Sequence, residues 1–175
     1  NLLFLSFYDD FDRFYDSICK SFLEFDAKFK GYELCIFPSS KLRKSKYVEE
    51  KVFLPLAVRR QDKKDVMSFD LNDKDLKFFT EYNNASGYNL ADQLVLKYMA
   101  FFYHYIQIKH IDYVIISGDT RFQSRLLAFI CKKLDVKFRY FEQGPFSTTT
   151  FDLNGTNCNA NFASSIQINS NANNL

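Results

Sequence analysis

Short apolar runs alternate with amphipathic stretches along this chain, and the alternation limits the folds that it can adopt. The run LLFLSF, residues 2–7, is followed by residues 9–29, where apolar side chains recur every three or four positions. The first pattern is typical of a buried strand and the second of a helix with one apolar face. A second apolar run, ELCIF at 33–37, comes after Gly31, which we expect to end the helix. A strand, a helix and a strand in this order favour parallel strands joined by a helical crossover.

The same alternation returns in the second half of the chain. Residues 90–111 are apolar on nearly every side, which predicts a long central helix that packs on more than one side. DYVIISG at 112–118 has the β-branched centre of a buried strand, residues 121–136 show helical spacing, and KFRYFE at 137–142 has the pattern of another strand. Together these segments predict an α/β domain over residues 1–160, with a Rossmann-like parallel sheet flanked by helices.

Other segments are less regular. Residues 38–72 hold two basic runs, KLRKSK at 41–46 and RRQDKK at 59–64, which are either solvated faces or a basic patch for a phosphate-bearing or membrane-surface partner. We expect a short helix over 73–82. The Asn- and Ser-rich residues 161–175 predict a polar tail or a truncated linker.

Composition excludes several classes of protein. A length of 175 residues and a hydrophobic share of 47% suit one globular domain, and a formal charge of +2 gives no argument for a nucleic-acid partner. No apolar run approaches the roughly 18 residues that indicate a membrane-spanning helix. Four scattered cysteines lack metal or disulfide spacing, which favours buried reduced thiols and a reducing compartment, the cytoplasm.

Polar loops follow three of the predicted strands, and in open α/β sheets ligands bind beyond the carboxyl ends of the strands. These loops begin at Phe7, Gly118 and Glu142. Gly118 permits a tight turn, and the helix after it offers free N–H groups that suit an anion or a sugar hydroxyl. Asp119 and Arg121 are therefore either ligand contacts or a helix cap and its ion pair.

The last of these loops, within FEQGPFSTTTFDLNGTN at 141–157, differs from the rest of the chain. Glu142 and Asp152 stand on adjoining turns, among glycines, a proline and three consecutive threonines. Two carboxylates at one edge of a sheet suit glycosyl chemistry, in which one attacks or stabilises an oxocarbenium-like centre while the other moves a proton. The alternative is that both carboxylates only order the turns.

Other kinds of chemistry have weaker support in the sequence. His104 and His110 lie six residues apart on the predicted long helix, a spacing that does not put them on one face, so we expect no metal site. The chain has no P-loop, no dinucleotide fingerprint and no metalloprotease or hydrolase motif.

Residues 112–160 resemble the capsule polysaccharide synthesis family, which includes bacterial β-Kdo transferases of capsule and lipopolysaccharide assembly. Members of that family carry a strand that ends in Glu-x-Gly, a Pro/Thr-containing stretch, and then Asp-x-x-Gly-x-Asn or a close variant. Residues 2–22 also look like the family's first strand and helix, whereas Thr156 stands where many relatives have Val. The matching positions are Glu142, Gly144, Asp152, Gly155 and Asn157.

The resemblance implies one half of a two-domain, GT-B-like glycosyltransferase that transfers Kdo from CMP-Kdo with retained β-configuration. It implies Asp152 as the nucleophile and Glu142 as a proton donor or second essential carboxylate, with no cofactor. The donor CMP-Kdo is expected to bind mainly to a domain outside this chain, and the acceptor is a glycan or glycolipid. The expected substrate contacts are Gly118, Asp119, Arg121, Gln143, Gly144, Thr149, Gly155 and Asn157.

Three functions stay open at this point. The first is the acceptor-side domain of such a transferase, held at the inner face of the cytoplasmic membrane by a basic segment such as 41–46. The second is a non-catalytic α/β module in capsule polysaccharide assembly or export, and the third is a nucleotide-binding domain of unrelated purpose. The transferase predicts that Asp152 is partly exposed, faces a cleft and lies near Glu142. The module predicts that local backbone hydrogen bonds use both carboxylates.

Overall fold

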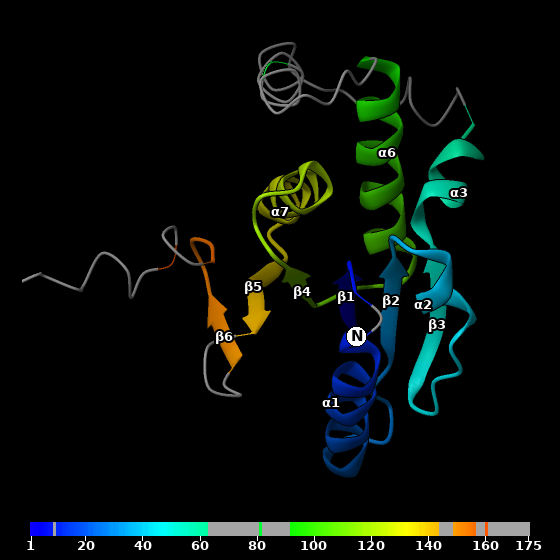
Figure 1. Ribbon diagram of the computed structural model, residues 1–175, viewed down its shortest axis with the longest axis vertical. Coiled ribbons are helices and arrows are strands. Elements are labelled where there is room, and N and C mark those ends of the chain that lie inside the picture. Colours follow the sequence, from blue (N-terminus) through cyan, green and yellow to red (C-terminus); the bar gives the residue numbers. More distant parts are fainter. Residues whose placement is uncertain (9, 63–80, 82–91, 144–148, 157–159, 161–175) are drawn as a thin grey trace, which may run out of the picture.

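A computed structural model describes residues 1–8, 10–62, 81, 92–143, 149–156 and 160. In this part of the chain six strands form one sheet, in the order β3-β2-β1-β4-β5-β6 (Figure 1). The first five strands are parallel, while β6 runs antiparallel to β5. The strands are β1 (Leu2–Ser6), β2 (Gly31–Cys35), β3 (Val48–Phe53), β4 (Tyr113–Ser117), β5 (Lys137–Gln143) and β6 (Thr149–Asp152).

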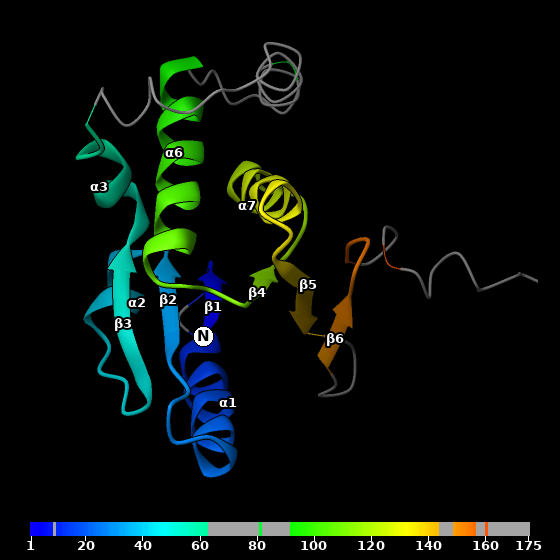
Figure 2. The same cartoon turned by 180° about the vertical axis from the view of Figure 1, so that it is seen from behind.

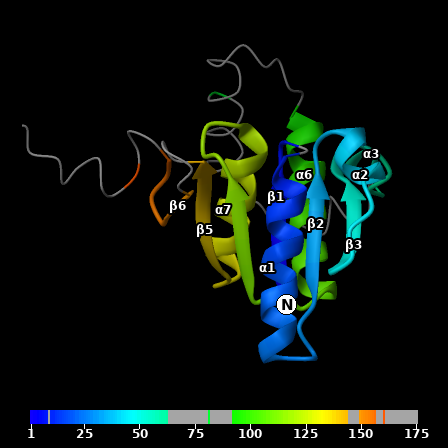
Figure 3. The ribbon, with the colours of Figure 1, turned by 60° about the horizontal axis from the view of Figure 1, so that its bottom comes forward.

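Helices cover both faces of the sheet (Figures 2 and 3). α1 (Phe11–Phe25) lies on one face, and α6 (Asp92–Ile108) and α7 (Phe122–Lys133) lie together on the other. Two short helices, α2 (Pro38–Leu42) and α3 (Leu54–Arg59), flank β3 in the chain. The predicted Rossmann-like α/β architecture, with a mostly parallel sheet between helices, is confirmed.

Alternate strand residues supply two hydrophobic cores, because successive side chains of a strand point to opposite faces. On β1, Leu3 and Leu5 belong to the core under α6 and α7, whereas Leu2 and Phe4 belong to the core under α1. The Phe4 ring stacks on that of Tyr15 in α1, with ring centroids 4.3 Å apart. Burial on both faces explains why the central strands are continuous apolar runs in the sequence.

Two predicted boundaries differ from the structure. α1 ends at Phe25 instead of near Gly31, because the Asp26 carboxylate accepts a hydrogen bond from the Lys28 N–H at 2.9 Å and closes a turn there. Gly31 instead opens β2, two residues before the predicted start of that strand. A Cβ at this position would collide with Sγ of Cys19, so the glycine serves close packing rather than helix termination.

Two strands at the edges of the sheet were not predicted. The irregular segment after β2 contains β3, and the polar loop after β5 contains β6. Both have sequences, VEEKVF and TTFD, that mix charged or polar residues with few apolar ones. The helix predicted over 73–82 lies outside the described residues apart from residue 81, and the predicted tail at 161–175 lies outside them altogether.

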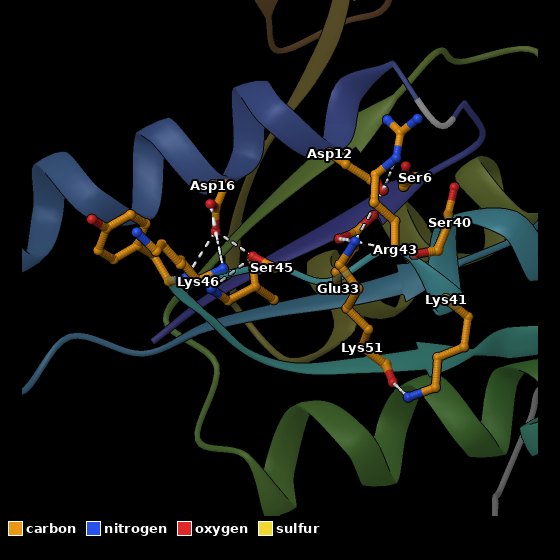
Figure 4. Close-up of polar contacts among 12 residues, drawn as sticks. Ser6, Asp12, Asp16, Glu33, Ser40, Lys41, Arg43, Ser45, Lys46 and Lys51 are labelled. Carbon is orange, nitrogen blue, oxygen red and sulfur yellow. Dashed lines mark hydrogen bonds and ion pairs between the residues drawn. The ribbon is translucent and has the colours of Figure 1, made fainter.

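Charged residues near β3 have partners inside the fold (Figure 4). Lys51 of β3 is buried, with its Nζ 3.0 Å from Asp12 Oδ2 and 3.1 Å from Glu33 Oε2. We call Asp12, Glu33 and Lys51 the buried charge cluster. In the basic run at 41–46, which begins inside α2, Arg43 Nε lies 3.9 Å from Asp12 Oδ2, and Lys41 donates a hydrogen bond to the Lys51 carbonyl. Two residues of this run therefore have an internal structural role.

Candidate functional site

A pocket of about 370 Å³ lies at the carboxyl edge of the sheet, near the ends of β1, β4 and β5. The chain leaves β1 toward β2 and leaves β4 toward β5, so the strand order reverses between β1 and β4. Open α/β sheets bind ligands in the crevice at such a reversal. We call it the switch-point pocket. All three predicted loops meet in it, with Tyr8 and Asp10 after β1, Gly118 and Arg121 after β4, and Glu142 and Gln143 at the end of β5.

Gly118 makes the sharp turn out of β4. Its φ is 67°, a left-handed conformation that a residue with a Cβ adopts only at a cost. Its N–H donates a hydrogen bond to the Phe141 carbonyl of β5 at 2.9 Å. α7 begins soon after this turn, and its N-cap residue, Arg121, makes no side-chain hydrogen bond to the helix end. The N-cap side chain is therefore available for other contacts at the pocket.

Arg121 is held against the loop that follows β1. Its Cζ lies 4.8 Å from the centroid of the Phe7 ring and 6.0 Å from that of Tyr8. Its Nη2 lies 3.4 Å from the Tyr8 hydroxyl. These aromatic contacts position the guanidinium at the pocket wall, and its five donors leave N–H groups for a ligand.

Ser117 is the last residue of β4 and lines the pocket. It is only 2% exposed, and its hydroxyl interacts with that of Tyr15 on α1. The hydroxyl of Tyr15 lies beside it, and burial raises the pKa of that tyrosine well above its usual value. Because buried polar groups are nearly always bonded, the contact between these two hydroxyls accounts for the burial of the Ser117 side chain within the fold.

Of the predicted carboxylate pair, Glu142 lines the pocket and Asp152 does not. In the β5–β6 ladder Glu142 lies opposite Thr150, and Asp152 lies opposite Tyr140. Both carboxylates therefore project from the same face of the sheet. They are diagonal neighbours, a relation that places residues roughly 7–8 Å apart, within reach of long side chains.

The half-buried Asp152 also has a local structural contact. Its Oδ1 accepts a hydrogen bond from the Asn154 N–H at 2.8 Å, which closes the turn after β6. On the neighbouring strand, the Thr150 hydroxyl donates to the Glu142 backbone carbonyl at 3.3 Å. The Glu142 side chain itself is half-buried at the pocket.

Asp119 fastens the turn after β6 to the end of β4. Its Oδ1 accepts a hydrogen bond from the Thr156 hydroxyl at 2.7 Å, and its Oδ2 accepts one from the Thr156 N–H at 3.1 Å. Both residues are buried, and Arg125 of α7 donates to the Asp119 carbonyl at 3.0 Å. Burial, assisted by Asp119, raises the pKa of Tyr140 to about 12. Asp119 thus acts as an anchor that brings Thr156 to the pocket.

The remaining predicted contacts are distributed around this site. Gly155 is buried next to the anchored Thr156, and Thr149 opens β6 opposite Gln143. Gly144 and Asn157 lie outside the described residues. The sequence signal for the loops was their polarity after an apolar strand, which does not identify the side chains that turn inward. Residues with polar side chains that line the pocket but were not selected from the sequence are Tyr8, Asp10, Ser117, Thr120 and Thr156.

Three further observations concern the part of the chain that the structure describes. No group of three or more His, Cys, Asp or Glu side chains is arranged there to hold a metal ion. Cys19, Cys35 and Cys131 are buried free thiols, as predicted, while Cys158 lies outside the described residues. None of the described helices has the length and apolar character needed to cross a membrane.

No protein-family model matches this chain, and no significant match was found among curated proteins or solved structures. The likeness to the capsule polysaccharide synthesis family therefore rests on the Glu-x-Gly and Asp-x-x-Gly-x-Asn residues themselves. The structure adds a Rossmann-like sheet and a polar pocket at its strand reversal.

Proposed function

We propose that this chain is the acceptor-side domain of a two-domain, GT-B-like glycosyltransferase of bacterial surface polysaccharide biosynthesis, which transfers β-Kdo from CMP-Kdo. One observation carries the proposal: Glu142 lines the switch-point pocket, and Asp152 is its diagonal neighbour on the same face of the sheet. The family resemblance supplies the substrate class. The fold supports it, because a polar pocket at a strand reversal is where an α/β domain binds its ligand.

In this proposal the two carboxylates have different roles in a double-displacement reaction. Asp152 attacks the anomeric carbon of Kdo, and CMP leaves with the electron pair of the broken bond. An acceptor hydroxyl then attacks the glycosyl-enzyme, its proton passes to Glu142, and the Asp152 carboxylate is released. Two inversions at one carbon give overall retention. The hydrogen bond from the Asn154 N–H to Asp152 Oδ1 orients the attacking group.

A second function, a non-catalytic α/β module in capsule polysaccharide assembly or export, is favoured by a different observation. Asp152 accepts a hydrogen bond from its own turn, and Asp119 accepts two from Thr156. Both aspartates thus order the segment around β6. In this alternative they are architectural, and the pocket only binds a glycan.

The two functions are distinguished by intact-protein mass spectrometry on the longest natural form of the protein that contains these residues. Incubation with CMP-Kdo alone is expected to add one Kdo unit to the wild type and none to Asp152→Asn. Glu142→Gln is expected to form the adduct but to transfer Kdo to a glycolipid acceptor about 10²–10⁴-fold more slowly, the usual contribution of a general base. Glu24→Gln, an exposed carboxylate on α1, is the matched control.

Each outcome decides between the alternatives. If both site variants transfer Kdo at the rate of Glu24→Gln, the carboxylates have no catalytic role. If a folded wild type forms neither adduct nor product, the non-catalytic module is supported instead. Circular dichroism of each variant shows whether a loss of transfer is a loss of fold.

A further inference from the structure

Tyr15 of α1 lies directly behind the wall of the switch-point pocket. Its ring centroid is 6.0 Å from that of Phe11 and 6.1 Å from that of Phe141, and its hydroxyl interacts with that of Ser117. Phe11, Phe141 and Ser117 all line the pocket. Tyr15 itself is fully buried. Any change in the surroundings of this tyrosine can therefore reach the pocket through three of its wall residues.

The same tyrosine is close to the buried charge cluster, because the charges of Glu33 and Asp12 both act on its hydroxyl. We propose that the charge state of Glu33 is transmitted through the Tyr15 hydroxyl to Ser117, so that the hydrogen bonding of the pocket wall changes with pH. The inference goes beyond the proposed function and does not depend on which ligand the pocket binds.

The geometry of the cluster identifies Glu33 as its proton-binding group. A single buried amine serves two carboxyl groups, since Lys51 Nζ lies 3.0 Å from Asp12 Oδ2 and 3.1 Å from Glu33 Oε2 (Figure 4). The guanidinium of Arg43, which is partly exposed, approaches Asp12 at 3.9 Å. Glu33 is fully buried and shares its amine with a competing carboxylate. Both conditions favour the neutral form of its carboxyl group.

Glu33 changes its charge near neutral pH. Burial, opposed by Lys51 and assisted by Asp12, raises the pKa of its carboxyl group to about 7. The other groups around it whose pKa values are shifted have ordinary values above about 8, and all are raised further: they are Tyr15, Cys19, Cys35 and Lys51. Asp12 and Arg43 complete the charged groups of this region.

The Tyr15 hydroxyl can respond to this charge because its proton is able to rotate. While Glu33 is neutral, Tyr15 donates its proton to Ser117 Oγ. The ionised carboxylate attracts the same proton, and such attraction is strong in the low-dielectric interior. The Tyr15 oxygen then becomes the acceptor, and Ser117 donates to it. A ligand that contacts this wall is therefore expected to bind with an affinity that depends on pH.

The test follows the pocket wall by NMR of the protein from about pH 5 to about pH 9, on either side of the raised pKa. In the wild type, the backbone amide signals of Ser117 and Gly118 are expected to shift in one step, with the midpoint of the Glu33 carboxyl carbon signal near pH 7. Tyr15→Phe removes only the hydroxyl, so it is expected to keep the Glu33 step and to lose most of the step at the pocket wall. Glu33→Gln loses both.

Glu142→Gln is the matched control, because Glu142 is a carboxylate of the pocket itself, and it is expected to keep the step. The proposal is overturned if Tyr15→Phe leaves the step undiminished, if Glu142→Gln removes it, or if the wall signals of the wild type do not follow Glu33. Should Glu33→Gln fail to fold, Tyr15→Phe still decides. No sugar substrate enters these measurements, so failure of this switch and failure of the proposed transferase are distinguishable.

Discussion

Gly31 shows how a single residue controls the fit between α1 and the sheet. It opens β2, and the position of a Cβ there overlaps Sγ of the buried Cys19 on α1. Replacement by alanine is therefore expected to lower the free energy of unfolding by about 1–3 kcal/mol, the usual cost of overpacking a core. Urea denaturation of Gly31→Ala followed by circular dichroism measures this loss.

The collision itself can be tested with a second variant. In a Cys19→Ala background the sulfur is gone, and the added Cβ would meet the Cβ of residue 19 at 3.6 Å, an ordinary contact. Gly31→Ala is then expected to be neutral or stabilising, which gives a coupling free energy of about 1–2 kcal/mol. Gly118→Ala serves as the contrast, because its cost comes from a φ of 67° and not from crowding. If Cys19→Ala relieves both substitutions equally, the proposed collision is wrong.

At the scale of elements, the buried charge cluster connects α1 to β2 and β3. Lys51 of β3 bridges Asp12 of α1 and Glu33 of β2, and Arg43 approaches Asp12 from the loop after α2 (Figure 4). One helical turn further on, Asp16 accepts hydrogen bonds from the N–H groups of Lys46 and Tyr47. The first half of α1 is thereby held in place, including the end that lines the switch-point pocket.

This cluster predicts a dependence of stability on pH. Burial, opposed by Lys51 and assisted by Asp12, raises the pKa of Glu33 from 4.5 to about 7. Between these values the folded protein holds a proton that the unfolded chain has lost. The free energy of unfolding is therefore expected to fall as pH rises from about 4.5 to about 7, by roughly 3 kcal/mol if the whole shift is expressed. Urea denaturation across this range measures the decrease.

The control for this prediction separates Glu33 from the other charges around it. Tyr15 and Cys35 also face the cluster, but their pKa values are raised far above this range, as is that of Lys51. Glu33→Gln is expected to remove the decrease, whereas Glu49→Gln, exposed on β3, retains it. An unchanged pH profile in Glu33→Gln would assign the effect to another group.

For the molecule as a whole, the sequence predicted the central strands and missed the edges. β1 and β4 are apolar runs because helices bury both of their faces, and the long α6 is apolar on most sides because it packs between the sheet, α3 and α7. β3 and β6 lie at the two edges. Their mixed sequences, VEEKVF and TTFD, cannot be distinguished from a polar loop without knowing what pairs with them.

At the candidate site, too, one part could be predicted from the sequence and another could not. The three loops were predictable because the carboxyl ends of parallel strands meet at one edge of a sheet. The side chains that face the pocket were not, since their direction depends on contacts between distant segments. Asp119 was selected for its charge but bonds to Thr156, 37 residues away. Ser117 was not selected, because a serine at the end of an apolar run gives no signal that it lines a pocket.

The single sheet predicts that the two cores unfold together. Ile115 and Ile116 are adjacent on β4, yet the first belongs to the core under α1 and the second to the core under α6 and α7. Valine at either position is expected to cost about 0.5–1.5 kcal/mol and to move one denaturant transition to lower concentration with its slope unchanged. Far-UV circular dichroism reports the backbone and near-UV circular dichroism the 11 tyrosines, and both should give the same midpoint.

The control is Ile108→Val, at a position that is 71% exposed, which should leave the denaturation midpoint unchanged. If Ile115→Val separated the two signals, α1 and its core would be an independent folding unit, and the sheet would not transmit stability from one face to the other.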